Sequence, residues 1–362
     1  MRVGILGGGQ LGRMIALAGY PLGITTTVLE PASESSAAQV CARIQGDFDD
    51  YRALYQLASV SDVITYEFEN VPVESVRWLA ERLPTYPSAE ALETAQDRIL
   101  EKQFFANLEI PVPPFAAVDT RDDFDTAIER IGLPAVLKTR RFGYDGKGQE
   151  VLRTVADAER AWEHLGGRPL ILEGFVAFDR ELSLIAVRST VGEIICYPLV
   201  QNTHEAGMLR LTLAPAPNLS PGLQQEAERY AKLTLQRLNY VGVLAIEFFE
   251  SKGRLSVNEM APRVHNSGHW SIEGSETSQF ENHIRAILGW KLGATTCRGV
   301  SAMWNLIGDV PHAGQIVTVN GAKLHLYGKS SRPNRKVGHI TICGVDESER
   351  DERLIRLREV MP

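Results

Sequence analysis

Two glutamates of this 362-residue chain lie inside apolar runs that are typical of β-strands. Glu247 is part of VLAIEFF (243–249), and Glu259 is part of RLSVNEM (254–260). A buried carboxylate without a partner is costly, so two of them on neighbouring strands favour a shared cation. Mg²⁺ prefers carboxylates together with the phosphate oxygens of a nucleotide, and Asn258 would add a neutral oxygen ligand. The alternative is that both glutamates face solvent from half-exposed strands.

A dense polar loop, APRVHNSGH, follows the second of these strands at 261–269. Arg263 offers a planar guanidinium that suits a small carboxylate-like anion. A zinc site is less favoured, because His265 and His269 lack the glutamate that stands between the histidines of an HExxH motif. The loop therefore predicts an anion pocket directly beside the proposed metal site.

Two further segments have the residue types of a nucleotide site. Lys138 ends an apolar strand, and the glycine-rich stretch RRFGYDGKGQ (140–149) follows it. Its glycines and cations predict a mobile loop that closes over a polyphosphate, with a solvent-exposed hairpin as the alternative. EGFV (173–176) leaves another strand, and Glu181 follows eight residues after Glu173. This arrangement would suit a purine held by strand-end amides and a ribose hydroxyl held by Glu181.

The N-terminus carries a glycine loop, GGGQLG (7–12), between a short apolar run and a helical pattern. The loop fits G-x-G-x-x-G, and Glu30 stands 18 residues after Gly12, as in dinucleotide-binding folds. A phosphate or ribose ligand at this loop is one interpretation, and a tight turn that packs a helix on a sheet is the other. An NAD cofactor is less favoured, because the rest of the chain supplies a different nucleotide site.

A third strand ends in TYEFEN (65–70), at the edge where open parallel sheets place their ligands. Glu67 and Glu69 would bind hydroxyl or amine groups at this edge. A solvated loop is equally compatible with the sequence.

A basic cluster near the C-terminus contrasts with the acidic balance of the chain. Four cations fall within eight residues, namely Lys329, Arg332, Arg335 and Lys336. They predict a site for a substrate phosphate, with a solvated basic loop as the alternative.

The composition limits the functions that these residues can serve. The chain has 38 Lys and Arg against 45 Asp and Glu, a formal net charge of −7. This balance argues against a general binder of nucleic acid or of anionic membranes, which needs a basic face. No apolar run approaches the roughly 18–20 residues that span a bilayer, and we expect no secretory signal. The four widely spaced cysteines argue against a zinc ribbon or a disulfide framework, so a cytoplasmic multidomain protein is expected.

The elements that must position these residues follow from periodicity. Strands alternate with helices along the first 88 residues, which predicts a parallel sheet with covered faces. Residues 89–108 read as one amphipathic helix, and β-type runs from 135 to about 200 indicate an antiparallel sheet. The other expected elements are strands at 2–6, 25–29, 63–66, 243–249, 254–260, 303–307, 322–327 and 337–342, and helices near 50–59, 73–82, 221–238, 276–289 and the C-terminus.

Taken together, these motifs resemble the ATP-grasp superfamily and, within it, the family of 5-(carboxyamino)imidazole ribonucleotide synthetases of purine biosynthesis. The matching strings are GGGQLGRM, YEFENV, the DRxxEK of 97–102, GYDGKGQ, NEMAPRVHNSGHW, NLIG (305–308) and RPNRKVGH. The resemblance implies an α/β and α+β fold in three parts. These are a Rossmann-like N-terminal domain (1–88), an ATP-grasp domain (89–292) and a small β-rich C-terminal domain (293–362).

Carried over position by position, the resemblance implies a role for most of the polar residues above. The implied ATP contacts are Arg98, Lys138, Gly143, Tyr144, Asp145, Gly146, Lys147, Gly148, Gln149, Glu173, Gly174, Phe175, Val176, Glu181, His204, Asn258 and Glu259. The implied Mg²⁺ ligands are Glu247 and Glu259, and the implied bicarbonate pocket is Tyr144, Arg263 and His265. The implied contacts to an aminoimidazole ribonucleotide are Gly9, Gln10, Leu11, Glu67, Glu69, Asp145, Asn266 and Ser267, with Lys329, Arg332, Arg335 and Lys336 near its phosphate. The implied catalytic residues are Tyr144, Asp145, Arg263, His265 and Lys329.

The implied activity is an ATP-dependent carboxylation. Bicarbonate and ATP would give carboxyphosphate and ADP, and the carboxyl group would pass to the exocyclic amine of 5-aminoimidazole ribonucleotide. ATP and Mg²⁺ are the expected cofactors, the partners are small molecules rather than nucleic acid or membrane, and the resemblance suggests a homodimer.

Three other functions compete with this one. The first is another ATP-grasp ligase, such as a formate-dependent glycinamide ribonucleotide transformylase or a biotin-carboxylase-like enzyme, which would differ in the loops at 265–269 and 329–339. The second is an NAD-dependent oxidoreductase, which would leave the paired glutamates without a purpose. The third is a non-catalytic scaffold, which would bind ATP without releasing phosphate.

Overall fold

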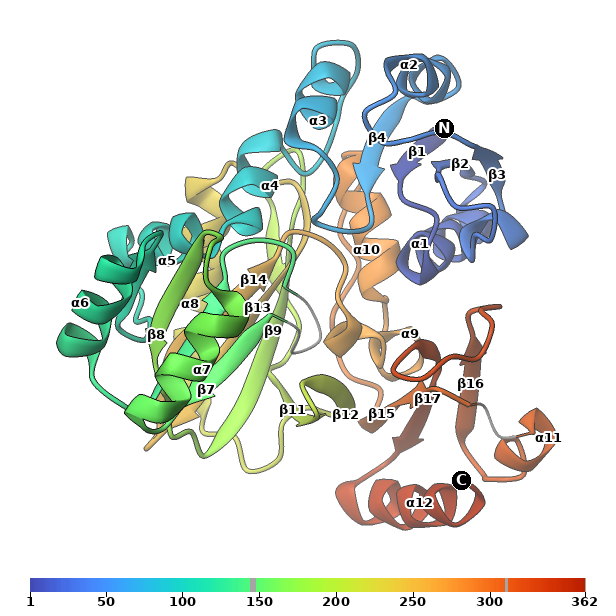
Figure 1. Ribbon diagram of the computed structural model, residues 1–362. Helices are drawn as coiled ribbons and strands as arrows, with labels where there is room; N and C mark the ends of the chain where they lie inside the picture. The colour runs from blue at the N-terminus through green and yellow to red at the C-terminus, as the bar shows by residue number, and fades with distance from the viewer. Residues whose placement is uncertain (144–147, 310–311, 362) are drawn as a thin grey trace.

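The structure is a computed structural model that describes residues 1–143, 148–309 and 312–361. Its strands form three sheets. In Figure 1 the N-terminal sheet lies at the upper right, the small sheet of residues 115–174 lies at the left, and the large sheet runs from the centre to the C-terminal part at the lower right. One sheet is parallel and two are antiparallel, so the predicted combination of α/β and α+β architecture is confirmed. None of the helices in the described ranges is long and apolar enough to cross a membrane.

The N-terminal sheet is parallel, with the strand order β3-β2-β1-β4. Its three predicted strands and its predicted helices are confirmed, whereas β3 was missed because its three residues, ARI, are exposed or half-exposed and give no apolar run. The carboxyl ends of β1 and β4 meet at one edge, where the glycine loop and the TYEFEN segment begin. The elements are β1 (Arg2–Leu6), α1 (Gln10–Gly19), η1 (Tyr20–Leu22), β2 (Thr25–Leu29), η2 (Ala37–Gln39), β3 (Ala42–Ile44), α2 (Tyr51–Ser59), β4 (Val63–Tyr66) and α3 (Val73–Ala80).

The single helix predicted over 89–108 is wrong. The structure has two helices, α4 (Ala89–Gln96) and α5 (Arg98–Asn107), with Asp97 between them in an extended conformation. The Asp97 carboxylate accepts a hydrogen bond from the Ile99 amide at 3.0 Å and so caps α5. Aspartate is favoured at such caps, and an apolar periodicity that continues through the break conceals it.

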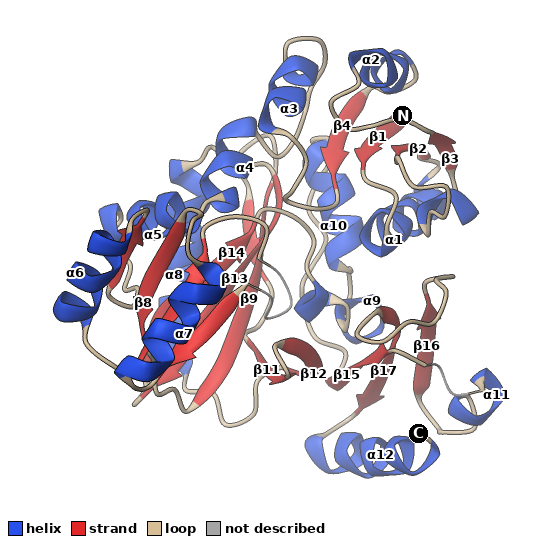
Figure 2. Ribbon diagram, viewed as in Figure 1, coloured by secondary structure: helices blue, strands red, loops and turns tan. Residues whose placement is uncertain are grey.

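A small antiparallel sheet follows, with the order β5-β8-β6-β7. Two helices cover it, α6 against β5 and β8 and α7 against β7 and β6 (Figure 2). The sequence reading overlooked both helices, although each begins with a Thr-x-x-Asp capping box. The elements are β5 (Phe115–Val118), α6 (Arg121–Ile131), β6 (Ala135–Thr139), β7 (Gln149–Leu152), α7 (Val155–Leu165) and β8 (Leu170–Gly174).

The third sheet is antiparallel and has the order β14-β13-β9-β11-β12-β15-β17-β16, with β10 beside β9. Pairing of β12 with β15 carries the sheet from the central part into the C-terminal part, and the predicted C-terminal strands and helix are confirmed. The elements are β9 (Arg180–Arg188), β10 (Ile194–Cys196), β11 (Val200–Glu205), β12 (Met208–Ala214), α8 (Pro221–Arg237), β13 (Gly242–Ser251), β14 (Arg254–Ala261), η3 (Asn266–Gly268), α9 (Ser271–Gly274), α10 (Gln279–Ile287), β15 (Val300–Ile307), α11 (Ala313–Ile316), β16 (Ala322–Leu326), β17 (Lys336–Gly344) and α12 (Glu347–Val360).

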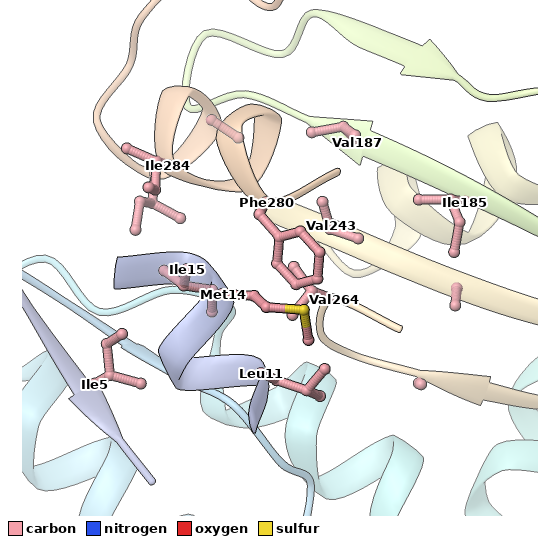
Figure 3. Close-up of a cluster of buried hydrophobic side chains, with 14 of the residues drawn as sticks. Ile5, Leu11, Met14, Ile15, Ile185, Val187, Val243, Val264, Phe280 and Ile284 are labelled. Atoms are coloured by element: carbon pink, nitrogen blue, oxygen red, sulfur yellow. The ribbon is translucent and has the colours of Figure 1, made fainter. Parts of the chain in front are cut away.

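A buried apolar cluster joins the N-terminal sheet to the large sheet (Figure 3). Leu11, Met14 and Ile15 of α1 meet Phe280 and Ile284 of α10, with residues of β9 and β13 behind them. Each such side chain contributes about 1.5–3 kcal/mol when it is fully buried. The cluster therefore fixes the start of α1, and with it the glycine loop, relative to the central strands.

Candidate active site

A cavity of about 880 Å³ lies where the three parts of the molecule meet. Its volume falls in the range of sites for small molecules and cofactors. The cavity is lined by 23 of the predicted site residues: Gln10, Leu11, Glu69, Arg98, Lys138, Gly143, Gln149, Glu173, Gly174, Phe175, Val176, Glu181, His204, Glu247, Asn258, Glu259, Arg263, His265, Asn266, Lys329, Arg332, Arg335 and Lys336.

The two strand-borne glutamates face each other in this cavity. Glu247 of β13 lies directly opposite Glu259 of β14. The register then shifts, so that Phe248 lies opposite Val257 and Asn258 is the extra residue of a β-bulge. A bulge re-aims side chains that a regular pleat would send to opposite faces. Asn258 and Glu259, although consecutive, therefore both line the cavity.

The two carboxylates have very different proton affinities. Burial raises the pKa of Glu247 to about 7, and the charge of Glu259 adds to this effect. Burial acts in the same direction on Glu259, but the Arg98 guanidinium, 2.7 Å from its Oε2, outweighs burial and lowers the pKa of Glu259 to about 2. A cation between these two groups would relieve their mutual repulsion.

The donor set of the glutamate pair fits Mg²⁺. Asn258 Oδ1 is buried and has no hydrogen-bond partner among the described atoms. Two carboxylates and this amide oxygen are hard ligands of the kind that Mg²⁺ takes together with nucleotide phosphates. Within the described ranges, no cluster of three or more His, Cys, Asp or Glu side chains could hold a metal ion alone. The pair would therefore hold the ion in company with phosphate oxygens.

Two lysines converge on Glu173, which also lines the cavity. Glu173 Oε2 lies 3.1 Å from Lys138 Nζ and 3.3 Å from Lys102 Nζ. Burial lowers the pKa of Lys138, and the Glu173 carboxylate opposes that effect. Lys138 lines the cavity, whereas Lys102 is fully buried behind it and donates to the carbonyl of Asn258 at 2.6 Å. Lys138 is thus placed to meet a phosphate, and Lys102 fixes the bulge of β14.

Arg263 and His265 form a polar pocket beside the glutamate pair. Arg263 donates from Nε and, at 2.9 Å, from Nη2 to the two carboxylate oxygens of Glu69. Burial, reinforced by the Arg263 charge, lowers the pKa of His265 to about 3, so its imidazole is neutral near pH 7. The Ser267 amide donates to His265 Nδ1 at 3.3 Å, which leaves the proton on Nε2, 3.4 Å from Glu247 Oε1. The pocket therefore offers a fixed cation and a neutral N–H.

A chain of buried hydrogen bonds orients His265. The side-chain NH₂ of Asn202 can only donate, and it donates to Ser183 Oγ at 2.8 Å. The Ser183 hydroxyl therefore donates to Ser267 Oγ at 2.7 Å, and the Ser267 hydroxyl donates to His265 Nδ1 at 2.9 Å. Thr212 begins the chain by donating to Asn202 Oδ1 at 2.9 Å. Ser183, Ser267 and Thr212 are fully buried, so every donor depends on its protein partner.

We expect Ser183→Ala to lower the free energy of unfolding by about 1–3 kcal/mol, because it leaves buried polar groups of Asn202 and Ser267 unsatisfied. Urea denaturation of the purified protein measures this loss. Asn202→Leu in the Ser183→Ala background should cost less than it does alone, since the chain is already broken. Equal costs in both backgrounds would contradict the proposed chain.

The remaining lining residues divide into an aromatic wall and a basic rim. Phe178 stacks on Phe249 with ring centroids 4.9 Å apart, and both line the cavity. Glu181 accepts a hydrogen bond from His204 at 2.8 Å. Burial alone would lower the pKa of His204, but Glu181 and Glu247 outweigh it and raise that pKa. The basic rim comes from the segment before β17, where Lys329 donates to Gln10 Oε1 and so joins the C-terminal part to the glycine loop.

The glycine loop itself is filled by side chains of the protein. The Gly8 amide donates to Glu30 at 2.8 Å, and the Gly12 amide donates to Glu67 at 2.5 Å. Glu30 therefore accepts a hydrogen bond from the loop itself, and the dinucleotide interpretation of the fingerprint receives no support.

Eight predicted site residues are not among those that line the described cavity. Four of them lie outside the described residues, namely Tyr144, Asp145, Gly146 and Lys147. Gly9, Glu67, Gly148 and Ser267 are described and lie behind the surface or beside it, with Glu67 and Ser267 buried. The sequence analysis also assigned no role to Lys102, Ser183 and Asn202. For Lys102 a signal existed, since it belongs to the DRxxEK string of 97–102.

The chain matches three family descriptions. Residues 1–96 match the ribonucleotide synthetase preATP-grasp domain, residues 103–280 match the ATP-grasp domain, and residues 301–353 match the phosphoribosylaminoimidazole carboxylase C-terminal domain. The first and last of these matches meet at the cavity through Gln10 and Lys329.

The chain is also similar along its whole length to known and solved proteins. It is 52% identical over 361 residues to N5-carboxyaminoimidazole ribonucleotide synthase of Pseudomonas aeruginosa, covering 100% of this chain and 99% of that protein. The crystal structure of N5-carboxyaminoimidazole ribonucleotide synthetase from Thermus thermophilus has a TM-score of 0.96 and 56% identity, covering 99% of this chain and 98% of that one. The Aspergillus clavatus N5-carboxyaminoimidazole synthase, solved with ADP and 5-aminoimidazole ribonucleotide, has a TM-score of 0.93 and 32% identity, covering 99% and 98%.

Proposed function

Since the chain belongs to the N5-carboxyaminoimidazole ribonucleotide synthase family of ATP-grasp ligases, we propose that it uses ATP and bicarbonate to carboxylate the exocyclic amine of 5-aminoimidazole ribonucleotide. The products are the N-carboxylated ribonucleotide, ADP and phosphate. The observation that carries the proposal is the pocket of Arg263 and His265, which opens into the same cavity as the Glu247–Glu259 pair.

The first step activates bicarbonate, which is otherwise a poor electrophile. A bicarbonate oxygen attacks the γ-phosphorus of ATP, the bond to ADP breaks, and carboxyphosphate forms. Arg263 and the neutral His265 hold bicarbonate in line, and Lys138 offsets the charge on the transferring phosphoryl group. Glu247, Glu259 and Asn258 would hold Mg²⁺, which would further offset the charge of the phosphates.

The second step transfers the carboxyl group. Carboxyphosphate breaks down to CO₂ and phosphate, the amine nitrogen attacks the CO₂ carbon, and a proton leaves the nitrogen. We assign the proton transfer to Asp145 on the basis of its place in the GYDGKGQ motif. The cations Lys329, Arg332, Arg335 and Lys336 hold the phosphate of the ribonucleotide, while Gln10 and Asn266 bind its other polar groups.

The proposed activity is tested by measuring ADP release with and without each substrate. We expect fast ADP release only when bicarbonate and 5-aminoimidazole ribonucleotide are both present. Release that depends instead on formate and glycinamide ribonucleotide would indicate a different ATP-grasp ligase, and ATP binding without release would indicate a scaffold. The domain boundaries at 88/89 and 292/293, a homodimeric state and a cytoplasmic location stay predictions from the sequence and the family.

We expect Arg263→Gln to raise the KM for bicarbonate at least about 100-fold, because a desolvated charge-assisted contact is worth about 2.7 kcal/mol or more. The KM for ATP should change much less, because Arg263 lies on the anion side of the cavity. Steady-state kinetics at varied bicarbonate concentrations checks this. Arg188→Gln is the control, since Arg188 of β9 donates to the Tyr240 carbonyl and is not among the residues that line the cavity. A change confined to the KM for ATP would contradict the assignment.

A further inference from the structure

Glu67 places its carboxylate inside the glycine loop, where the fingerprint would predict the phosphate of a ligand. Glu67 follows β4 and is 6% exposed. Its Oε1 accepts a hydrogen bond from the Gly9 amide, and its Oε2 accepts one from the Gly12 amide at 2.5 Å. Both contacts run from the end of β4 to the start of α1, the helix that follows the neighbouring strand β1.

These two contacts are those of a helix cap. Helix α1 begins at Gln10, its N-cap residue Gly9 has no side chain, and its first turn contains no acidic residue. In a capping box, the N-cap residue and the third helical residue satisfy each other's amides. Glu67 satisfies both amides alone, from a position 55 and 58 residues further along the chain. A negative charge is also favourable at the positive end of the helix.

The spacing of the glycines matches the side chain of Glu67. A Cβ atom at Gly9 would lie 2.6 Å from Glu67 Oε1, and one at Gly12 would lie 3.3 Å from Oε2. A Cβ atom at Gly7, where φ is +107°, would overlap the Cγ of Glu67. All three glycines of the G-x-G-x-x-G motif therefore leave room for this one carboxylate.

The residues between the capped amides face the cavity. Gln10 and Leu11 lie between Gly9 and Gly12 and line the cavity. Gln10 Oε1 accepts a hydrogen bond from Lys329, which the proposed function places near the substrate phosphate. Any movement of the loop would therefore displace Gln10 and Leu11, together with the contact between Gln10 and Lys329.

We propose that Glu67 is a positioning residue, which takes the place of a ligand phosphate in the glycine loop and thereby holds Gln10 and Leu11 against the ribonucleotide. This inference rests on the proposed function for its substrate. It replaces the direct substrate contact that the sequence predicted for Glu67, and it excludes a dinucleotide at this loop.

The test compares Glu67→Ala and Glu67→Gln with the wild-type enzyme. We expect each variant to raise the KM for 5-aminoimidazole ribonucleotide about tenfold or more, with the KM for ATP changed less than about twofold. Sodium formate, which can enter the loop vacated in Glu67→Ala, should lower that KM and raise the thermal midpoint. Sodium chloride at equal ionic strength should do neither, and formate should not affect the wild type.

A control separates positioning from a general loss of stability. Asp50→Ala removes the side-chain cap of α2, a helix of the same N-terminal part, because the Asp50 carboxylate accepts a hydrogen bond from the Arg52 amide. It should lower the thermal midpoint without raising the KM for the ribonucleotide. Wild-type kinetic constants in both Glu67 variants, or no formate effect on the thermal midpoint of Glu67→Ala, would overturn the inference. ADP release by the wild type that does not depend on the ribonucleotide would instead contradict the proposed function. The effect of formate on the thermal midpoint of Glu67→Ala would still test the role of Glu67 in the loop.

Discussion

Glu259→Gln is expected to lower ADP release about 10³-fold or more while leaving the chain folded. The substitution keeps the size of the side chain and removes the charge that would face the metal ion and phosphates. Loss of one preorganised charge at a phosphoryl-transfer site costs about 4 kcal/mol of transition-state stabilisation, which is a factor of about 10³. Single-turnover measurements at saturating ATP and Mg²⁺ give the rate directly.

Glu250→Gln is the matched control for this experiment. Glu250 lies on β13, forms a buried ion pair with Arg180, and is separate from the cavity lining. Its substitution should lower the unfolding free energy but keep the rate per folded molecule within about threefold. Near-normal turnover in Glu259→Gln, with its fold intact, would refute the metal assignment of the glutamate pair.

Lys138→Met should lower the rate of ADP release about 10²–10³-fold, because it removes the cation that the proposed mechanism assigns to the transferring phosphoryl group. Lys102→Met is the informative comparison, since both lysines contact the same oxygen of Glu173 and only Lys138 lines the cavity. We expect Lys102→Met to act mainly on stability and on the KM for ATP, through the loss of its contact with the Asn258 carbonyl. Both variants are measured by rapid quench and by urea denaturation. A larger rate loss in Lys102→Met than in Lys138→Met would reverse the assignment.

The strand pair that carries the glutamates could be predicted because its signals are local. Two apolar runs flank Lys252 and Gly253, whose positive φ values of 51° and 74° belong to a tight hairpin turn. The bulge at Asn258 could not be predicted, because it depends on how β14 meets β13 and on the buried Lys102 behind it. The sequence therefore indicated which residues meet and not how they are aimed.

The environment of His265 shows the same limit more clearly. The orientation and the tautomer of its ring depend on Ser267, which is held in turn by Ser183 of β9 and, through it, Asn202 of β11. Neither Ser183 nor Asn202 stands in a motif, since a serine and an asparagine in a strand are ordinary. Only the pairing of β9 with β11 brings them together, and such long-range register has no local signature.

The glycine loop illustrates a motif whose pattern predicts the backbone but does not decide which group binds its amides. G-x-G-x-x-G correctly predicted a strand, a tight turn and a helix start. The pattern requires room and amide donors at the turn, and a carboxylate from the same chain meets that requirement as well as a phosphate does. Glu67 could be chosen over a ligand only after β4 was seen to lie beside β1.

The most direct test of the account follows the oxygen atoms of bicarbonate. The enzyme is given ¹⁸O-labelled bicarbonate, ATP and 5-aminoimidazole ribonucleotide, and the released phosphate is analysed by mass spectrometry or ³¹P NMR. If a bicarbonate oxygen attacks the γ-phosphorus between Arg263, His265 and the glutamate pair, one ¹⁸O atom enters each phosphate formed. Phosphate without the label, released together with the carboxylated ribonucleotide, would contradict the account.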